Sequence, residues 1–155
     1  MGPDVELYQN KIMVVYSPAG GNGKSEIAAN LSFLLARKGL RTWIIDSNTF
    51  APTQDLIFGI PVTDKTFSEF LIDNRLMDIP TYDLAKMQKR FQGTRIALTP
   101  SRRTDPDIRF QVHEAQNYGG TLAEKIPQAI FRQIMERQVD LLIVDTHPGF
   151  EQINE

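Results

Sequence analysis

Residues 11–25, KIMVVYSPAGGNGKS, decide the fold that this sequence predicts. The apolar run at 11–16 is rich in β-forming residues, which is typical of a short buried strand. A glycine-rich turn follows, and the segment after it has the apolar period of a helix that ends near Gly39. Its apolar residues are expected to share one helical face, and they are Ile27, Leu31, Leu34 and Leu35. A strand, a glycine-rich loop and a helix in this order are the usual setting of a phosphate-binding loop.

Strand-like and helix-like segments alternate along the rest of the chain. The expected strands are 41–46, 94–100 and 139–145, and the expected helices are 55–58, 66–74, 84–90 and 121–138. In the last helix, Pro127 either causes a kink or marks the true first turn, and Thr121 with Glu124 is a candidate capping box. The alternation predicts an α/β fold with a mostly parallel sheet covered on both sides, in one domain over residues 1–155.

Composition excludes several classes of protein. The 155 residues carry a net charge of −2, which offers no general attraction for nucleic acid. Because the chain has no cysteine, it contains no disulfide, thiolate metal site or cysteine nucleophile, which fits a cytoplasmic location. It has neither an apparent signal peptide nor an apolar run long enough to cross a bilayer.

The loop at 20–25 has the three features that a phosphate site needs. Gly20, Gly21 and Gly23 allow a sharp turn whose backbone N–H groups point inward, next to the positive end of a helix. Lys24 is placed to reach the β- and γ-phosphates, and the hydroxyl of Ser25 to ligate magnesium. The alternative is a glycine-rich turn in which Gly-Lys-Ser occurs by chance.

Three motifs together resemble one known family. The commonest phosphate-loop pattern requires glycine at position 18, where this chain has Pro18, but GGNGKS matches a variant loop. With that loop the sequence resembles the ParA/MinD family of P-loop ATPases. The segment 44–59, IIDSNTFAPTQDLIFG, resembles the family's first switch, and 141–149, LLIVDTHPG, resembles the second switch of its MinD-like branch. The resemblance implies a P-loop NTPase-like three-layer sandwich.

The resemblance also implies a role for individual residues of an ATP and Mg²⁺ site. Gly21, Asn22, Gly23 and Gly149 would offer backbone N–H groups to the phosphates, together with the turn at Gly20 and the side chain of Lys24. Asp46 and Asp145 end two strands and would face the magnesium ion beside Ser25. The alternative for each aspartate is that it simply caps the turn after its strand.

Two departures from the family pattern predict weak hydrolysis. The family's lysine before the glycine pair, which reaches across a dimer, is replaced here by Ala19. The second aspartate of the first switch is replaced by Asn48, which can orient water but cannot accept its proton. A cation supplied in trans is worth roughly 10³–10⁵ in rate, so we expect a weak ATPase with Lys24 and Asn48 as its catalytic groups.

A third departure is length, because the chain resembles only the N-terminal part of the family. The absent part is expected to supply base recognition and cover for one edge of the sheet.

Two functions follow from the resemblance. One is an ATP-dependent switch that forms a homodimer and positions an unknown protein partner on DNA or a membrane. The other is a degenerate, non-hydrolysing scaffold of the kind that localises pilus assembly. Metal-delivery and electron-transfer relatives are set aside because they use cysteines. His113 and His147 are not expected to bind metal, and Arg102 with Arg103 is expected in a solvated loop, with a contact to DNA or a partner as the alternative.

Overall fold

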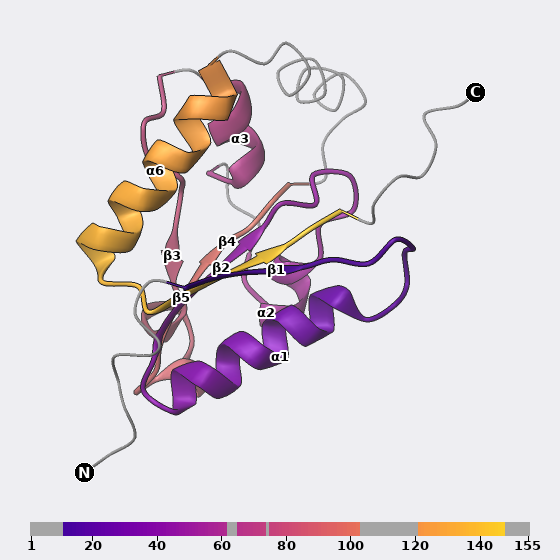
Figure 1. Ribbon diagram of the computed structural model, residues 1–155. Coiled ribbons are helices and arrows are strands. Elements are labelled where there is room, and N and C mark those ends of the chain that lie inside the picture. The colour runs from indigo at the N-terminus through magenta and orange to yellow at the C-terminus, as the bar shows by residue number, and fades with distance from the viewer. Residues whose placement is uncertain (1–10, 62–64, 74, 103–120, 148–155) are drawn as a thin grey trace.

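The computed structural model describes residues 11–61, 65–73, 75–102 and 121–147. A five-stranded sheet runs through these residues in the order β1-β5-β2-β4-β3 (Figure 1). The strands are β1 (Lys11–Val15), β2 (Arg41–Asp46), β3 (Tyr82–Asp83), β4 (Arg95–Thr99) and β5 (Leu141–Asp145). All pairs are parallel except β3 with β4. The expected mostly parallel sheet is therefore confirmed.

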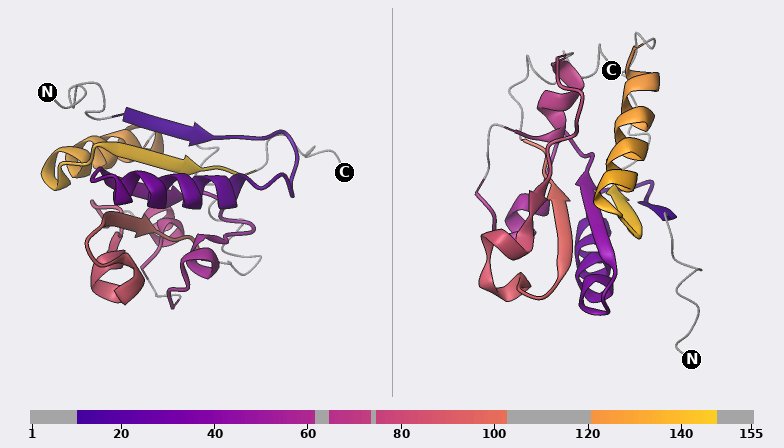
Figure 2. Two further views of the ribbon diagram at one scale, coloured as in Figure 1. Left: turned by 90° about the horizontal axis from the view of Figure 1, so that it is seen from below. Right: turned by 90° about the vertical axis from the view of Figure 1, so that its left-hand side faces the viewer.

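Helices cover both faces of this sheet, which confirms the three-layer arrangement (Figures 1 and 2). They are α1 (Lys24–Arg37), α2 (Gln54–Phe58), α3 (Phe67–Ile72), α4 (Leu84–Met87) and α6 (Thr121–Arg137), with a 3-10 turn at Lys89–Phe91. Helix α1 lies on one side of the sheet, and α3 and α6 lie on the other (Figure 1).

Alternate residues of the central strands point to opposite faces of the sheet and pack into two separate cores. On the α1 side, Ile44 and Ile143 pack with the small residues Ala28 and Ala36. On the α6 side, Trp43 packs with residues of α3, α6 and β5. The indole N–H of Trp43 donates a 2.9 Å hydrogen bond to the hydroxyl of Thr99, so this buried polar group is satisfied. The period-2 alternation of the strands thus accounts for both cores.

One expectation about burial is wrong, and the apolar face of α1 is buried only in part. Strand β1 is the edge of the sheet in the described structure, and Ile12 and Val14 are 47% and 59% exposed (Figure 2). In α1, Ile27 and Leu34 are each 56% exposed, while the helix is buried through smaller residues. Those residues are Ala28, Ala29, Ser32 and Ala36. Small side chains allow α1 to approach the sheet closely, whereas the large aliphatic residues sit toward its flanks.

The remaining elements agree closely with the expected ones. Two features are new, and the place of Pro127 is decided. The two-residue antiparallel strand β3 was not expected. A capping box forms between Thr66 and Glu69 at the start of α3. Helix α6 begins at Thr121, so Pro127 lies inside the helix and is not its first turn. In the part of the chain described here, none of the helices is both long enough and apolar enough to span a bilayer.

We expect Leu142→Ala to lower the free energy of unfolding by about 2–5 kcal/mol, because the leucine is fully buried on β5 and its loss leaves a cavity. The matched control is Leu56→Ala, since Leu56 is 67% exposed and its loss should change stability by less than about 0.5 kcal/mol. Urea denaturation followed by fluorescence measures both. Equal effects at the two positions would contradict the described core.

Candidate functional site

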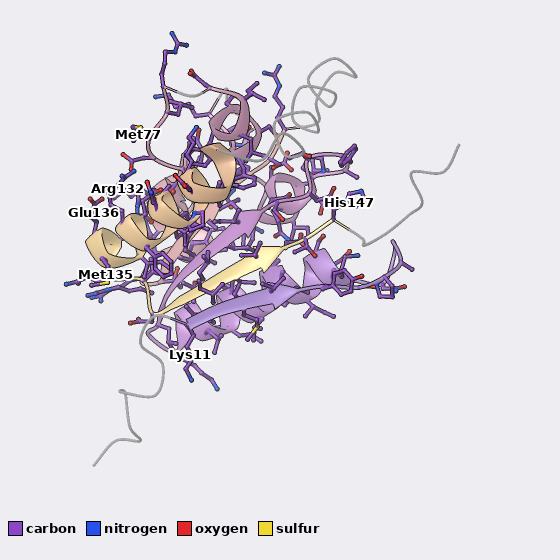
Figure 3. The ribbon with its side chains drawn as sticks, turned by 45° about the horizontal axis from the view of Figure 1, so that its top comes forward. Lys11, Met77, Arg132, Met135, Glu136 and His147 are labelled. Carbon is purple, nitrogen blue, oxygen red and sulfur yellow. The ribbon has the colours of Figure 1, made fainter. Side chains whose placement is uncertain are left out.

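The candidate site lies at the carboxyl ends of the parallel strands, where open α/β sheets bind ligands. His147 lies just beyond the end of β5, and Lys11 lies at the opposite end of the sheet (Figure 3). A cavity of about 260 Å³ opens at the glycine-rich loop. It is lined by Gly20, Gly21, Asn22, Gly23, Lys24, Ser25, Glu26, Asn48, Ala51 and Thr53. The structure therefore brings the loop and the segment after β2 together around one space.

The loop conformation depends on two glycines with left-handed backbone angles. Gly21 and Gly23 both have φ of 73°, a value that disfavours side chains with a Cβ. Gly23 is also the N-cap of α1, so the turn leads directly into the first N–H groups of that helix. Asn22 Nδ2 donates a 2.8 Å hydrogen bond to Ser17 Oγ, which in turn donates to the carbonyl of Ala19. Ser17, which the sequence analysis did not single out, thus holds the loop together.

Lys24 points back across the loop. Its Nζ donates a 3.2 Å hydrogen bond to the carbonyl oxygen of Ala19, and the residue is only 9% exposed. The ammonium group is therefore held above the loop by a neutral acceptor. A phosphate oxygen would be a stronger acceptor for the same donor, because its charge assists the hydrogen bond.

Asp46 and Asp145 lie opposite each other on neighbouring parallel strands. Their residues are 0% and 1% exposed. Asp46 accepts hydrogen bonds from the backbone N–H groups of Asn48, Thr53 and Gln54, at 3.0–3.1 Å. Burial raises the pKa of Asp46 from 3.8 to about 7; the N–H of Gln54 lowers it, and the charge of Asp145 raises it further. Asp46 therefore both organises the segment after its strand and holds a proton more tightly than an exposed aspartate.

Asp145 is held by a side chain that the sequence analysis missed. Gln54 Nε2 donates to Asp145 Oδ2 at 2.7 Å and to the carbonyl oxygen of Ser25 at 2.9 Å. The other oxygen, Asp145 Oδ1, is buried and has no hydrogen-bond partner in the described structure. A buried carboxylate oxygen without a donor, next to the helix start that carries Ser25, suits a hydrated magnesium ion. The residues present thus fit the expected metal.

Asn48 lines the cavity, but its amide is already engaged. Its Nδ2 donates to the carbonyl of Ala51, and its Oδ1 accepts from the N–H of Ala51, both at 3.0 Å. These bonds close a local turn, so the side chain has little capacity left to orient a water molecule. A catalytic Asn48 stays a prediction.

Glu26 is a third residue that the sequence analysis missed, after Ser17 and Gln54. It lies in the first turn of α1 and lines the cavity. A carboxylate there interacts favourably with the helix dipole but repels a phosphate.

An aromatic contact joins the segments after β2 and β5. The rings of Phe50 and His147 meet edge to face, with their centroids 4.9 Å apart. Gly149, Arg103 and His113 lie outside the described residues, so their expected places are untested. Arg102 is described, and its guanidinium lies 3.9 Å from the carboxylate of Glu69.

The fold and the loop define a P-loop type of nucleotide-binding domain. Residues 13–143 match the family described as "CobQ/CobB/MinD/ParA nucleotide binding domain". Because this match spans most of the chain, the chain belongs to that family.

Three relatives carry different named roles. The MinD septum site-determining protein of Pyrococcus horikoshii, solved with Mg-ADP, superposes with a TM-score of 0.67 at 20% identity, over 91% of this chain and 50% of that one. An iron-sulfur cluster carrier protein of Pyrococcus furiosus is 28% identical over 88% of this chain and 43% of its own length. The flagellum site-determining protein YlxH of Helicobacter pylori is 38% identical over 32% of this chain and 17% of its own. The chain thus spans half or less of each of these proteins.

We expect Asp46→Asn to flatten the pH dependence of stability between about pH 4 and pH 7. The folded pKa of about 7 lies above the ordinary value of 3.8, so in this interval the folded state holds a proton that the unfolded state has lost. The free energy of unfolding therefore falls as pH rises, by at most about 1.4 kcal/mol per pH unit for one proton. Urea denaturation across this pH range measures the slope.

The control for this measurement is Glu136→Gln, which changes an exposed carboxyl on α6 (Figure 3). It should leave the slope as it is in the wild type. A wild-type slope that Asp46→Asn does not alter would contradict the raised pKa.

Proposed function

We propose that this domain binds ATP with magnesium and acts as a nucleotide-dependent switch with weak hydrolysis. The observation that carries the proposal is one cavity shared by the glycine loop, the first turn of α1 and the segment tied to Asp46. Thr53 lines this cavity, and its backbone N–H is bonded to Asp46. Phosphates need N–H donors and positive charge, whereas a hydrated cation needs oxygen ligands. The donors line this cavity, and Asp46 lies behind its wall, bonded to Thr53.

Each residue has a separate part in this proposal. The N–H groups of Gly21, Asn22 and Gly23 bind the phosphates with the turn at Gly20, and Lys24 leaves the Ala19 carbonyl to contact the β- and γ-phosphates. Ser25, Asp46 and Asp145 hold magnesium and its waters, with Gly149 as a further proposed contact to the γ-phosphate. When bound, magnesium neutralises charge on the β- and γ-phosphates. Glu26 opposes this binding, because its carboxylate lines the same cavity.

Two observations support weak hydrolysis. Ala19 supplies only a backbone carbonyl where a lysine would reach a partner subunit, and the amide of Asn48 is engaged by Ala51. These same observations favour the second candidate, a degenerate scaffold that binds nucleotide weakly or not at all and does not hydrolyse it. Homodimerisation belongs to the switch proposal only.

The cellular role is proposed from the relatives. The MinD and YlxH proteins are both named as site-determining, which favours positioning of a partner. DNA or a membrane as the surface is proposed from the family resemblance alone. The similarity to an iron-sulfur cluster carrier reopens the metal-delivery class, which the sequence analysis set aside. That exclusion rested on 155 residues without cysteine, and their match to the carrier covers only 43% of the carrier's length. It therefore applies only to thiolate chemistry within these residues.

We expect Lys24→Ala to weaken binding of a fluorescent ATP analogue with magnesium by roughly 100-fold, because one charge-assisted bond to phosphate is lost. The wild type should bind in the micromolar range in a fluorescence titration. Lys38→Ala is the matched control, since Lys38 is exposed at the far end of α1 and should leave affinity unchanged. Equal binding by all three proteins would contradict the phosphate role of the loop.

We expect the double variant Ala19→Lys with Asn48→Asp to release phosphate from ATP at least ~10-fold faster than the wild type, because a trans cation alone is worth roughly 10³–10⁵. Phosphate release at saturating ATP measures this, and the same pair in a Lys24→Ala background controls for contaminating ATPase. Turnover in the double variant but none in the wild type favours the scaffold. Wild-type turnover equal to that of the double variant would contradict impaired hydrolysis.

A further inference from the structure

Gln54 hydrogen-bonds to three elements near the candidate site, namely β2, β5 and α1. It is the first residue of α2 and is 0% exposed. Its backbone N–H donates to Asp46 Oδ2 at 3.1 Å, at the end of β2. Its side-chain Nε2 donates to Asp145 at the end of β5 and to the Ser25 carbonyl in α1. A single residue thus joins two strands and the helix that begins at the phosphate loop.

The orientation of the Gln54 amide follows from its neighbours. Asp145 Oδ2 and the Ser25 carbonyl are both acceptors, at 2.7 and 2.9 Å from the same side-chain atom. The NH₂ group must therefore face them, because the amide oxygen would meet two other oxygens. With the NH₂ group used in this way, the amide oxygen Oε1 is left buried and has no partner.

Buried oxygens without a hydrogen-bond partner occur on both side chains of the Gln54–Asp145 contact. Among the described residues, the buried side-chain atoms without a hydrogen-bond partner are Gln54 Oε1, Asp55 Oδ1, Ser68 Oγ and Asp145 Oδ1. Two of these lie on the side chains joined by the 2.7 Å bond. A buried acceptor without a donor is costly, and the usual remedy is a water molecule or an ion. The waters of a bound cation would supply donors here.

We propose that Gln54 is a positioning residue for magnesium in the nucleotide site, an inference that rests on the proposed function. Its NH₂ group fixes Asp145 through Oδ2 and so leaves Oδ1 for the waters of the ion. The same group holds the first turn of α1, where Ser25 lies, against the segment 46–54. Magnesium affinity therefore depends on Gln54, although its amide nitrogen does not contact the metal.

The decisive comparison is between two buried glutamines. Gln54→Met keeps the length of the side chain and removes its donors. Gln133→Met is the matched control, because Gln133 is 2% exposed and bonds to the backbone of Ile79, within the α6-side core. Both substitutions should lower stability in thermal melts. Only Gln54→Met should lower the affinity for magnesium.

The readout is the magnesium concentration that half-saturates the protein–ADP complex. We expect Gln54→Met to raise it about 10- to 100-fold, the range typical when a group that orients a metal ligand is removed. ADP affinity in EDTA should stay within about twofold of the wild type. The inference is overturned if Gln54→Met requires no more magnesium than Gln133→Met does.

Hydrogen exchange in the wild type keeps the inference testable if Gln54→Met does not fold. Amide exchange is compared in ADP with magnesium and in ADP with EDTA. Magnesium should slow it at three places at once: segment 46–54, the first turn of α1 and the end of β5. Slowing confined to the loop at 20–25 would overturn the inference.

A wild type that binds no ADP under either condition would overturn the proposed function instead. The structural role of Gln54, which joins segment 46–54 to Asp145 and Ser25, would then be tested by hydrogen exchange without added nucleotide. Faster exchange of segment 46–54 in Gln54→Met than in Gln133→Met supports it, and equal exchange overturns it.

Discussion

The parallel pairing of β2 with β5 places two buried carboxylates, Asp46 and Asp145, side by side, and the rest of the site is arranged around them. Such a pair loses its hydration and repels itself, so each member needs donors or neutralisation. Asp46 obtains three backbone N–H groups, which fold the segment 46–54 back over the strand end. Asp145 obtains the amide of Gln54. The path of the chain after β2 therefore follows from the need of the buried Asp46 carboxyl for hydrogen-bond donors.

Periodicity and glycine placement predict the elements well because both are local properties. The strand 41–46 and the glycine loop needed no tertiary information. Burial was predicted less well, because a period shows which residues share a face and not what covers that face. Strand β1 is apolar yet lies at an exposed edge, and α1 packs through Ala28 and Ala36. Gln54 was missed for the same reason, since its role depends on partners 29 and 91 residues away.

Binding and hydrolysis make separate demands on this fold. The proposed phosphate site would use mainly backbone groups, in a loop shaped by the glycines at 21 and 23 and by the start of α1. Hydrolysis depends on particular side chains, and the positions 19 and 48 are those at which the chain differs from the family pattern. A sequence can therefore lose turnover while its loop geometry persists. Membership of a nucleotide-binding family therefore indicates nucleotide binding but does not by itself indicate hydrolysis.

The candidate site is ordered by contacts within the chain itself. Ser17 holds the loop, the Ala19 carbonyl holds Lys24, and the Phe50–His147 contact joins the segments after β2 and β5. The free energy of ordering these groups is thus spent largely during folding, so less is lost when a ligand binds. What remains for a ligand is to replace particular partners, above all the Ala19 carbonyl at Lys24. Gln54 contacts Ser25 of α1 as well as Asp46 and Asp145 at the ends of β2 and β5. A nucleotide bound as we propose would therefore be linked to both strand ends through direct contacts, which gives the proposed switch a physical basis.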